Sequence, residues 1–404
     1  MTVEEPKPSY GINHPYISKI RLKGYKSIKD ASIEFKQGLN ILIGPNGSGK
    51  TNLLDFLVDL GQIGKIKNSH SCNVAFRNLD GKEWLYSKDT GHYIFSSDVK
   101  KPLQKVIETL KKDKEVIVNT AYNLSDKTQV DYWNDINFIF YFTKINFDLP
   151  DKILGLNEPF SLKLKYELNK ENFPSIEILT PIKSLLDEQI LIRLSSIFTF
   201  LIFERKEITW ENLTTKNLFL DASFSDNVIE NFNKFSPIKN IKIDEDLSVK
   251  TKHKNEEVSV EIKYLRLSFL VDDEWISWDM LSDGTKRLFY IIFLLSTNEP
   301  SEKYLIEEPE LGIHPHQLHL LMTFLKEKSE DNQIIITTHS PQVLNILDED
   351  ELDRIIITKN EKKKGTTLRN LSDRELKKAK SFMEEDGLSL SDYWIHSDLE
   401  EQIL

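Results

Sequence analysis

Hydrophobic and polar residues follow three patterns along this chain, and each pattern predicts a different kind of element. Alternation of apolar and polar positions, expected for strands with one exposed face, occurs over 17–35, 161–168 and 258–271. Short, mainly apolar runs, typical of buried strands, occur at 39–43, 304–306 and 334–336. Helical spacing of apolar residues occurs at 52–60, 181–203, 288–295 and 373–383. The mixture predicts an α/β fold.

A glycine-rich segment follows the buried strand predicted at 39–43. Residues 44–51 read GPNGSGKT and fit G-x-x-x-x-G-K-[ST], the loop that wraps a nucleotide's phosphates in backbone N–H groups. A helix expected to begin near Lys50 points its positive end at that anion. Lys50 is expected to reach the β- and γ-phosphates, and the Thr51 hydroxyl to ligate Mg²⁺. A glycine-rich surface turn is the alternative interpretation, but the order strand, loop, helix favours ATP binding.

The residues expected to contact the phosphates are Gly44, Pro45, Asn46, Gly47, Ser48, Gly49, Lys50, Thr51 and Asn52.

Composition excludes several classes of protein. The single cysteine, Cys72, rules out an internal disulfide and suits a reducing cytoplasm, where we expect the protein to reside. The longest apolar segments, 194–203 and 288–295, are far shorter than the ~20 residues of a membrane helix, so no membrane association is expected. A net charge of −11 argues against indiscriminate binding to nucleic acid. Local basic clusters, at 19–29, 111–114 and 361–364, leave DNA binding open, although solvated surface charge is the simpler explanation.

Three further segments follow residue 280. LSDGTKR at 281–287 precedes an apolar helix, YLIEEPE at 304–310 ends an apolar strand in two carboxylates, and QIIITTHS at 333–340 ends another in histidine. Alone, each has an ordinary structural explanation: a helix N-cap, a turn after a strand and a hydrogen-bonded loop histidine. Their order behind a phosphate loop favours a shared nucleotide site.

In this combination the chain resembles the ABC-type ATPase heads of the RecF, SMC and recombination-repair ATPases, and most of all the OLD-like ATPases. The resemblance implies a P-loop NTPase head, with helices on both faces of a mixed sheet, an antiparallel β lobe and an α+β insertion. Residues 1–70 and 258–358 are expected to form the two parts of the head. Residues 71–257 would form the insertion, with specificity or partner contacts, and 359–404 a helical tail.

The resemblance also assigns roles to the residues after 280. Glu307 is expected to hold Mg²⁺, Glu308 to polarise the attacking water, and His339 to contact the γ-phosphate. Most family members have Asp at the Glu307 position, and the longer side chain favours contact through water. Lys26, with Arg21 and Tyr25, stands where family heads touch the nucleoside, although a plain sheet edge is an alternative.

The LSDG segment predicts the stoichiometry. Ser282, Asp283 and Gly284 begin a helix, and helix starts attract anions. In the family this helix addresses the γ-phosphate on the other subunit. The chain has one phosphate loop and one LSDG, so the resemblance implies a head-to-tail homodimer around two ATP molecules.

The biological role suggested by the family is control of a separate effector, a nuclease or toxin, in prokaryotic anti-phage defence, as in the ATPase subunits of Septu and PARIS. The residues after His339 are too few for the Toprim nuclease domain that follows some OLD-like heads, so the effector is expected elsewhere. Two alternatives remain: a RecF-like clamp that binds DNA, and an ATP-dependent scaffold with negligible turnover. The sequence does not identify the trigger or the glutamine that usually couples the head to its insertion.

Aromatic residues of the insertion allow a specific version of DNA binding, in which they stack on bases, although buried core positions are the more common explanation. The residues concerned are Trp84, Tyr132, Trp133, Phe138, Phe140 and Tyr141.

Overall fold

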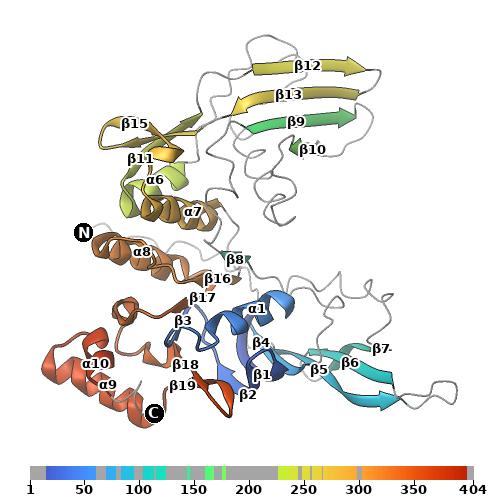
Figure 1. Ribbon diagram of the computed structural model, residues 1–404, viewed down its shortest axis with the longest axis vertical. Helices are drawn as coiled ribbons and strands as arrows, with labels where there is room; N and C mark the ends of the chain where they lie inside the picture. Colours follow the sequence, from blue (N-terminus) through green and yellow to red (C-terminus); the bar gives the residue numbers. More distant parts are fainter. Residues whose placement is uncertain are drawn as a thin grey trace, which may run out of the picture. The chain divides into compact units, whose positions relative to one another are not determined.

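The computed structural model describes residues 15–60, 70–78, 83–94, 103–112, 115–123, 143–145, 160–167, 175–178, 226–243, 248–254, 257–265, 267–297 and 303–397 (Figure 1). The chain forms two compact units. The first comprises Met1–Asn146, Glu299–Leu311 and Met322–Leu404. The second comprises Phe147–Asn298 and Gly312–Leu321.

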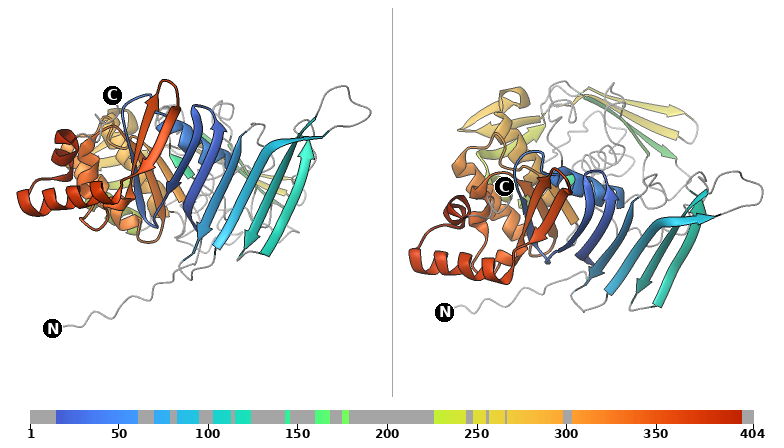
Figure 2. Two further views of the ribbon diagram at one scale, coloured as in Figure 1. Left: turned by 90° about the horizontal axis from the view of Figure 1, so that it is seen from below. Right: turned by 60° about the horizontal axis from the view of Figure 1, so that its bottom comes forward.

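The first unit is built on a 12-stranded sheet with the order β7-β6-β5-β4-β1-β2-β19-β18-β3-β17-β16-β8. Figure 2 shows its strands side by side as one continuous layer. The sheet has two halves. Strands β18, β3, β17, β16 and β8 pair in parallel, whereas every pairing from β18–β19 to β6–β7 is antiparallel. The predicted α/β class with a mixed sheet is confirmed.

The parallel half consists of short strands, several of which are mainly apolar. Its members are β3 (Leu39–Ile43), β8 (Thr143–Ile145), β16 (Lys303–Glu307), β17 (Gln333–Thr338) and β18 (Ile355–Glu361). Every residue of β3 and β17 is buried, as expected for strands covered on both faces. The three short apolar runs of the sequence therefore lie in neighbouring strands of one sheet, β3, β17 and β16.

The antiparallel half keeps the alternating pattern that the sequence predicts. Strands β1 and β2 form a hairpin in which Ile20 faces Ile33, and buried and exposed residues alternate along both strands. The strands of this half are β1 (Tyr16–Tyr25), β2 (Ile28–Glu34), β4 (Ser71–Arg77), β5 (Glu83–Ile94), β6 (Leu103–Lys112), β7 (Glu115–Asn123) and β19 (Gly365–Asn370). In this hairpin one face is thus mainly apolar and the other polar.

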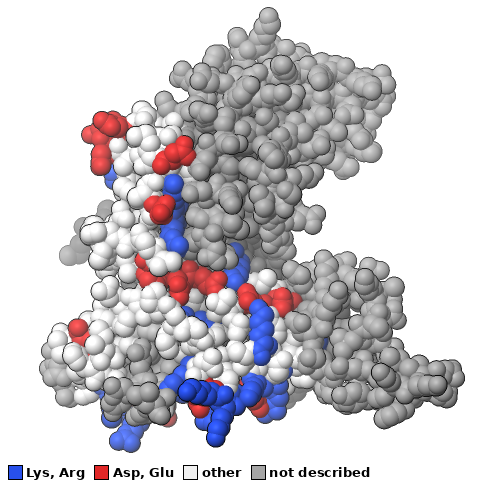
Figure 3. Space-filling model, in the orientation of Figure 1, with Lys and Arg blue, Asp and Glu red and all other residues white. Residues whose placement is uncertain are grey.

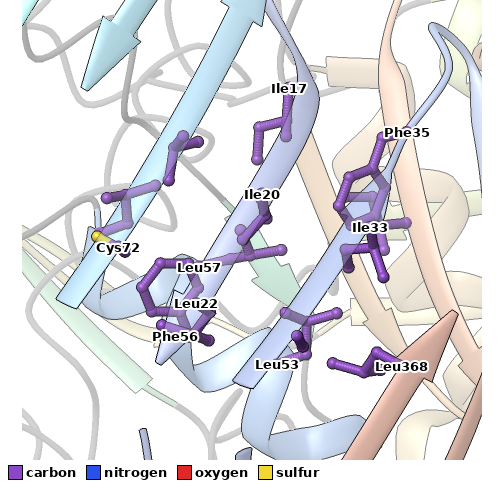
Figure 4. Packing of buried hydrophobic residues seen from close by; sticks show 14 of the residues in the cluster. Ile17, Ile20, Leu22, Ile33, Phe35, Leu53, Phe56, Leu57, Cys72 and Leu368 are labelled. Carbon is purple, nitrogen blue, oxygen red and sulfur yellow. The ribbon is translucent and has the colours of Figure 1, made fainter. Parts of the chain in front are cut away.

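Helix α1 (Lys50–Leu60) packs its apolar side on this sheet. Leu53, Phe56 and Leu57 belong to the same buried cluster as Ile20 of β1 and Leu368 of β19 (Figure 4). The cluster also includes Leu305 and Ile335, from the parallel half. One core therefore fixes the helix that begins in the glycine loop to both halves of the sheet.

The described residues of the second unit include two smaller sheets and the helices α6 and α7. One sheet has the order β10-β9-β13-β12 and the other β11-β14-β15. The strands are β9 (Phe160–Glu167), β10 (Ser175–Ile178), β11 (Ile238–Ile243), β12 (Ser248–Lys254), β13 (Glu257–Leu265), β14 (Leu267–Val271) and β15 (Glu274–Ser277). The alternation predicted at 161–168 and 258–271 corresponds to β9, β13 and β14.

Helices α6 (Asp226–Phe235) and α7 (Asp283–Thr297) pack through aromatic rings. Phe289 of α7 stacks on Phe232 at a centroid distance of 5.3 Å. The same ring meets Phe269 and Trp278 edge-on, at 5.3 and 5.4 Å. Such pairs stabilise a core beyond simple area burial, so the helix that begins at the LSDG segment has a fixed position within its unit.

The remaining helices follow β16 in the chain. Helix α8 (Pro315–Lys328) comes between β16 and β17, and the 3-10 segments η4 (Pro341–Ile346) and η5 (Leu352–Arg354) between β17 and β18. The predicted tail helix is α9 (Asp373–Asp386), followed by α10 (Leu390–His396). Capping boxes at Ser372 and Ser389 set the first turns of these two helices.

Some predictions lie outside the described residues. These are the helix at 181–203, the apolar segment at 194–203 and the aromatic residues Tyr132, Trp133, Phe138, Phe140 and Tyr141. Trp84 is described and is buried within β5, so this ring belongs to the core and is not available to stack on bases. Among the helices that the structure describes, none has the length and apolar character needed to cross a bilayer.

Candidate functional site

The predicted catalytic segments meet at one edge of the sheet. Strand β17 pairs in parallel with β3 on one side and with β16 on the other. Parallel neighbours end at the same edge, where α/β proteins bind ligands. The glycine loop leaves β3 at that edge, Glu308 leaves β16, and His339 leaves β17. Three segments that are up to 295 positions apart in the sequence, counted from Gly44 to His339, therefore converge.

Glycine is required at two loop positions by close contacts. A Cβ added at Gly44 would lie 2.0 Å from the Thr358 carbonyl oxygen of β18. A Cβ at Gly49, where φ is +101°, would lie 2.1 Å from the Thr366 hydroxyl of β19. Since neither contact is possible for a larger residue, the loop and these two strands fit together only with glycine.

Polar side chains from β18 and β19 hold the loop's carbonyl groups. The Thr366 hydroxyl donates to Ser48 O at 3.0 Å, and Asn360 Nδ2 donates to Gly47 O at 3.3 Å. Ser27, in the turn between β1 and β2, is hydrogen-bonded to both Thr366 and the predicted ligand Asn52. With its carbonyls bound on the protein side, the loop is positioned to direct N–H groups toward an anion.

Lys50 is the buried cation of the site. Its ammonium donates to the carbonyl oxygens of Gly44 and Pro45, at 2.8 and 3.1 Å. Burial lowers the pKa of Lys50, and the negative charges of Glu308, Glu310 and Glu307 oppose that shift. The ammonium thus lies between the glycine loop and the carboxylates, where a triphosphate would need positive charge.

Glu308 and His339 are brought together, as their predicted roles require. His339 Nδ1 lies 3.3 Å from Glu308 Oε1. The backbone of Glu308 has φ of +42°, which is rare for a residue with a side chain, and its N–H donates to Thr337 O at 2.9 Å. Strained backbone of this kind is concentrated at functional sites. The conformation turns the chain sharply after β16 and places the carboxylate beside the histidine.

Glu310 is a member of the site that the sequence interpretation left without a role. Its carboxylate accepts a hydrogen bond from the Thr338 hydroxyl and another from the His339 N–H, at 3.3 Å for the latter. His339 Nδ1 is 3.7 Å from the same Glu310 oxygen, and the Glu310 side chain is only 7% exposed. Glu310 therefore ties the segment after β16 to the histidine after β17. The sequence feature that could have identified Glu310 is its position as a further acid shortly after the pair Glu307 and Glu308.

Lys144 and Asp55 are two further residues that no sequence motif identified. Lys144 Nζ is 3.2 Å from Glu307 Oε2 and 2.8 Å from Asp55 Oδ1. Burial alone would lower the pKa of Lys144. Hydrogen bonds and charge from Asp55 and Glu307 outweigh that effect and raise this pKa. Lys144 belongs to β8, which lies beside β16.

Two of the three residues considered for nucleoside contact, Tyr25 and Lys26, have protein partners. Lys26 Nζ pairs with Asp55 Oδ2 at 2.6 Å, and the Tyr25 hydroxyl donates to Asp59 Oδ2 at 2.6 Å. The Tyr25 ring is buried, and burial, followed by the hydrogen bond to Asp59, raises its pKa strongly. Tyr25 is thus a core residue, whereas Lys26 remains at the surface and its contact with a nucleoside stays a prediction.

The basic cluster at 19–29 is a surface of mixed charge. Lys19 pairs with Glu34 and Lys23 with Asp30, at 2.8 and 3.3 Å, across the β1–β2 hairpin. Figure 3 shows acidic side chains among the basic ones at the lower part of the described surface. Solvated surface charge, the simpler explanation, therefore accounts for these two lysines.

The LSDG segment forms the start of α7, within the second unit. Ser282 Oγ accepts a hydrogen bond from the Thr285 N–H at 3.1 Å, as an N-cap residue does. A Cβ added at Gly284 would lie 2.6 Å from Gly312 O, so this position also requires glycine. Ser282 and Asp283 are exposed, and Met280 just before them is 70% exposed. The predicted signature is thus a capped helix start on the surface of its unit.

The oxygen groups available for a magnesium ion are the Thr51 hydroxyl and Glu307. No group of three or more His, Cys, Asp or Glu that could hold a metal occurs among the described residues. Mg²⁺ is usually bound through one or two protein oxygens, water and the phosphates of a nucleotide. Thr51 is exposed at the start of α1, and Glu307 ends β16 at the same edge.

Comparison with known proteins agrees with this geometry. Residues 39–345 match the family model described as "AAA domain, putative AbiEii toxin, Type IV TA system". An ATP/GTP phosphatase of Helicobacter pylori is 22% identical over 363 residues, which cover 82% of this chain and 88% of that protein. The DNA replication and repair protein RecF of Francisella tularensis subsp. novicida is 34% identical over 65 residues, 16% of this chain and 19% of RecF.

Two solved structures are similar to the chain at low identity. An SMC head bound to the C-winged helix domain of ScpA has a TM-score of 0.46 at 17% identity, over 90% of this chain and 100% of that one. An SMC head with an extended coiled coil, bound to a ScpA domain from Pyrococcus furiosus, has a TM-score of 0.44 at 17% identity, over 93% and 100%. Since the family model matches more than half of the sequence, the chain belongs to the AAA_21 family of AAA domains.

Proposed function

We propose that the chain binds ATP with Mg²⁺ at the edge of its parallel strands and hydrolyses it, with Glu308 activating the attacking water. The observation that carries this proposal is that Lys50, Glu308 and His339 lie in the segments that follow three adjacent parallel strands, β3, β16 and β17. Family membership and the Helicobacter pylori relative, which is named an ATP/GTP phosphatase, support ATP hydrolysis as the reaction.

Each residue has a role that its position permits. The loop N–H groups and Lys50 would bind the phosphates, and phosphoryl transfer asks a protein mainly for such positioning and charge stabilisation. Magnesium, held by Thr51 and Glu307, would supply charge neutralisation at the phosphates. Glu308 would accept a proton from water, and His339, hydrogen-bonded through its backbone to Glu310, would contact the γ-phosphate.

Glu308→Gln is the direct test of the reaction. The substitution keeps the size of the side chain and removes the base, so turnover should fall about 10²–10³-fold, within the range typical of general bases, while ATP binding persists. Phosphate release measures the first quantity and equilibrium binding of a fluorescent ATP analogue the second. Full turnover in Glu308→Gln would remove this residue from the catalytic role.

We further propose that two copies associate head to tail around two ATP molecules. The support is the capped start of α7 at Ser282 and the exposed Met280 beside it, a surface that a second copy could cover. Helix starts favour anions such as a γ-phosphate. If this is right, Glu308→Gln with ATP should elute as a dimer, and Asp283→Arg in the same background should return it to a monomer.

The ATPase is proposed to regulate a separate effector protein, a nuclease or toxin, in anti-phage defence. The family description, which mentions a putative toxin and a type IV toxin–antitoxin system, supports a partner-dependent role. Affinity capture of Glu308→Gln from its host, compared with Lys50→Ala, tests it: a partner held only by the ATP-trapped form is expected.

A RecF-like DNA clamp is the second candidate function. The similarity to RecF favours it, but that similarity covers only 19% of RecF, and Lys19 and Lys23 on β1 are paired with acids. Stimulation of hydrolysis by DNA, lost as salt is raised, would support the clamp over the effector-linked ATPase.

A further inference from the structure

Lys144 occupies the position beside the first carboxylate of the acidic pair. Strand β8 pairs in parallel with β16, with Lys144 opposite Leu305 and Ile145 opposite Ile306. Side chains two apart on a strand share a face, so Lys144 extends on the same side as Leu305 and Glu307. Leu305 lies in the cluster beneath α1, and the Lys144 side chain therefore runs between α1 and the end of β16.

The Lys144 ammonium bridges two carboxylates. It lies 2.8 Å from Asp55 Oδ1 and 3.2 Å from Glu307 Oε2, with the lysine side chain 17% exposed. Asp55 also holds Lys26 through its other oxygen, at 2.6 Å. A partly buried ammonium is costly without such partners, so the two contacts together account for its position.

Glu307 is also the carboxylate assigned to Mg²⁺ in the proposed function, on which this inference rests. An ammonium at Oε2 repels a divalent cation approaching the same group, and it uses lone pairs that a metal or its water would need. Asp55 offers Lys144 a second partner, so the lysine can leave Glu307 without becoming an unpaired buried charge.

We propose that Lys144 is a positioning residue that competes with Mg²⁺ for Glu307 and so sets how much magnesium the site requires. Without metal, Lys144 holds Glu307 and links β8 to α1. With metal and nucleotide bound, it remains on Asp55 alone. The role concerns metal affinity rather than the chemical step, since Lys144 itself contacts no reacting atom in this scheme.

The test measures Mn²⁺ binding by electron paramagnetic resonance, with a non-hydrolysable ATP analogue present. Lys144→Met should raise Mn²⁺ affinity about tenfold, because a repelling charge is removed. Asp55→Asn should lower the affinity severalfold, because Lys144 then has only Glu307. Opposite shifts distinguish competition from a structural role, in which both substitutions would weaken binding.

Two controls complete the design. Lys144→Arg keeps the charge and should not raise Mn²⁺ affinity above that of the unaltered chain. Lys326→Met removes another ammonium that pairs with two carboxylates, those of Asp348 and Glu351, at 2.6 and 2.8 Å. This substitution should leave Mn²⁺ affinity unchanged. Thermal melting verifies that each variant is folded.

The outcomes separate the two proposals. Unchanged or weaker Mn²⁺ binding in Lys144→Met overturns the competition, as does unchanged or tighter binding in Asp55→Asn. If Lys144→Met does not fold, Lys144→Gln takes its place, with the same expected rise in Mn²⁺ affinity. Failure of the unaltered chain to bind the analogue, with or without Mn²⁺, overturns the proposed ATP site itself.

Discussion

The parallel and antiparallel halves of the large sheet share one hydrophobic core but have different surfaces. In the parallel half, β3 and β17 are buried throughout, and polar groups occur where the strands end. In the antiparallel half, β1 and β2 expose every second residue or so, and many of those residues are charged. Burial on both faces leaves only the strand ends for chemistry, so the parallel half concentrates its functional groups at one edge.

The same comparison explains why charged residues of the two halves differ in burial and in the groups with which they interact. Lys50 and Glu310 are largely buried and interact with other groups of the site. Lys19 and Lys23 are about half exposed and pair with acids across a hairpin, an arrangement that contributes little to stability. Substitutions in the two halves should therefore differ both in which property they change and by how much.

The largest expected difference concerns nucleotide binding. Lys50→Ala should weaken ATP binding about a hundredfold or more, because the buried cation facing the phosphates is lost. Lys19→Ala on β1 should change it less than about twofold, since that lysine is exposed. Titration with a fluorescent ATP analogue measures both. Comparable losses in the two variants would place part of the binding surface in the antiparallel half.

Stability should show the next difference. Leu305→Ala in β16 removes a fully buried side chain and should lower the free energy of unfolding by about 2–5 kcal/mol. Lys23→Ala on the exposed face should change it by less than about 0.5 kcal/mol. Urea denaturation followed by circular dichroism provides the values. A small effect of Leu305→Ala would mean that the two halves do not share one cooperative core.

A smaller effect is expected from Glu310, which connects two strand ends of the parallel half. Glu310→Gln should lower the turnover rate about tenfold, because the His339 segment loses a charged acceptor. ATP affinity should remain within about twofold, since Glu310 accepts its hydrogen bonds from Thr338 and His339 and not from the glycine loop. Steady-state kinetics with a parallel binding titration separates these quantities. An equal loss of affinity would show that Glu310 supports the phosphate loop instead.

The smallest effect depends on pH and lies at the antiparallel half. Burial raises the pKa of Glu375, but hydrogen bonds from Arg369 and Ser372 outweigh it and lower this pKa from 4.5 to about 2. An acid with a lowered pKa stabilises the fold above pH 4.5, and the benefit is lost as pH falls toward 2. Arg369→Met should therefore cost about 1 kcal/mol at pH 6 and less at pH 3. Denaturation at both pH values measures the difference.

Lys380→Met is the control for that comparison, since it removes an exposed pair with Glu384, at 3.6 Å. Its effect should be near zero at either pH. A cost of Arg369→Met that does not change between pH 6 and pH 3 would contradict the role of Glu375.

Much of the sheet was predictable because its two halves follow different local patterns. The alternation at 17–35 corresponds to the β1–β2 hairpin, and the runs at 39–43, 304–306 and 334–336 lie in β3, β16 and β17. Periodicity of burial produces both patterns, and it needs no knowledge of distant contacts. The order of strands, in which β19 separates β2 from β18, has no such local signal.

The site, too, has residues that the sequence identifies and residues that it does not. The glycine loop, the acid pair and the histidine are each recognisable because their chemistry demands particular residue types at fixed spacing. Thr366, Glu310 and Lys144 were not assigned, because a threonine, a glutamate or a lysine has many uses and gains this one only from its neighbours.

The sequence by itself thus determined the kinds of element, the phosphate loop and the likeness to an ATPase head, since these depend on short-range periodicity and spacing. Tertiary structure alone decided which groups interact. Lys144 pairs with Glu307, Glu310 accepts a hydrogen bond from the His339 N–H, and Thr366 donates one to Ser48 of the glycine loop. The physical reason is that hydrogen bonds and charge interactions act over a few ångströms in space. Distance along the chain carries no information about them once the strands have paired.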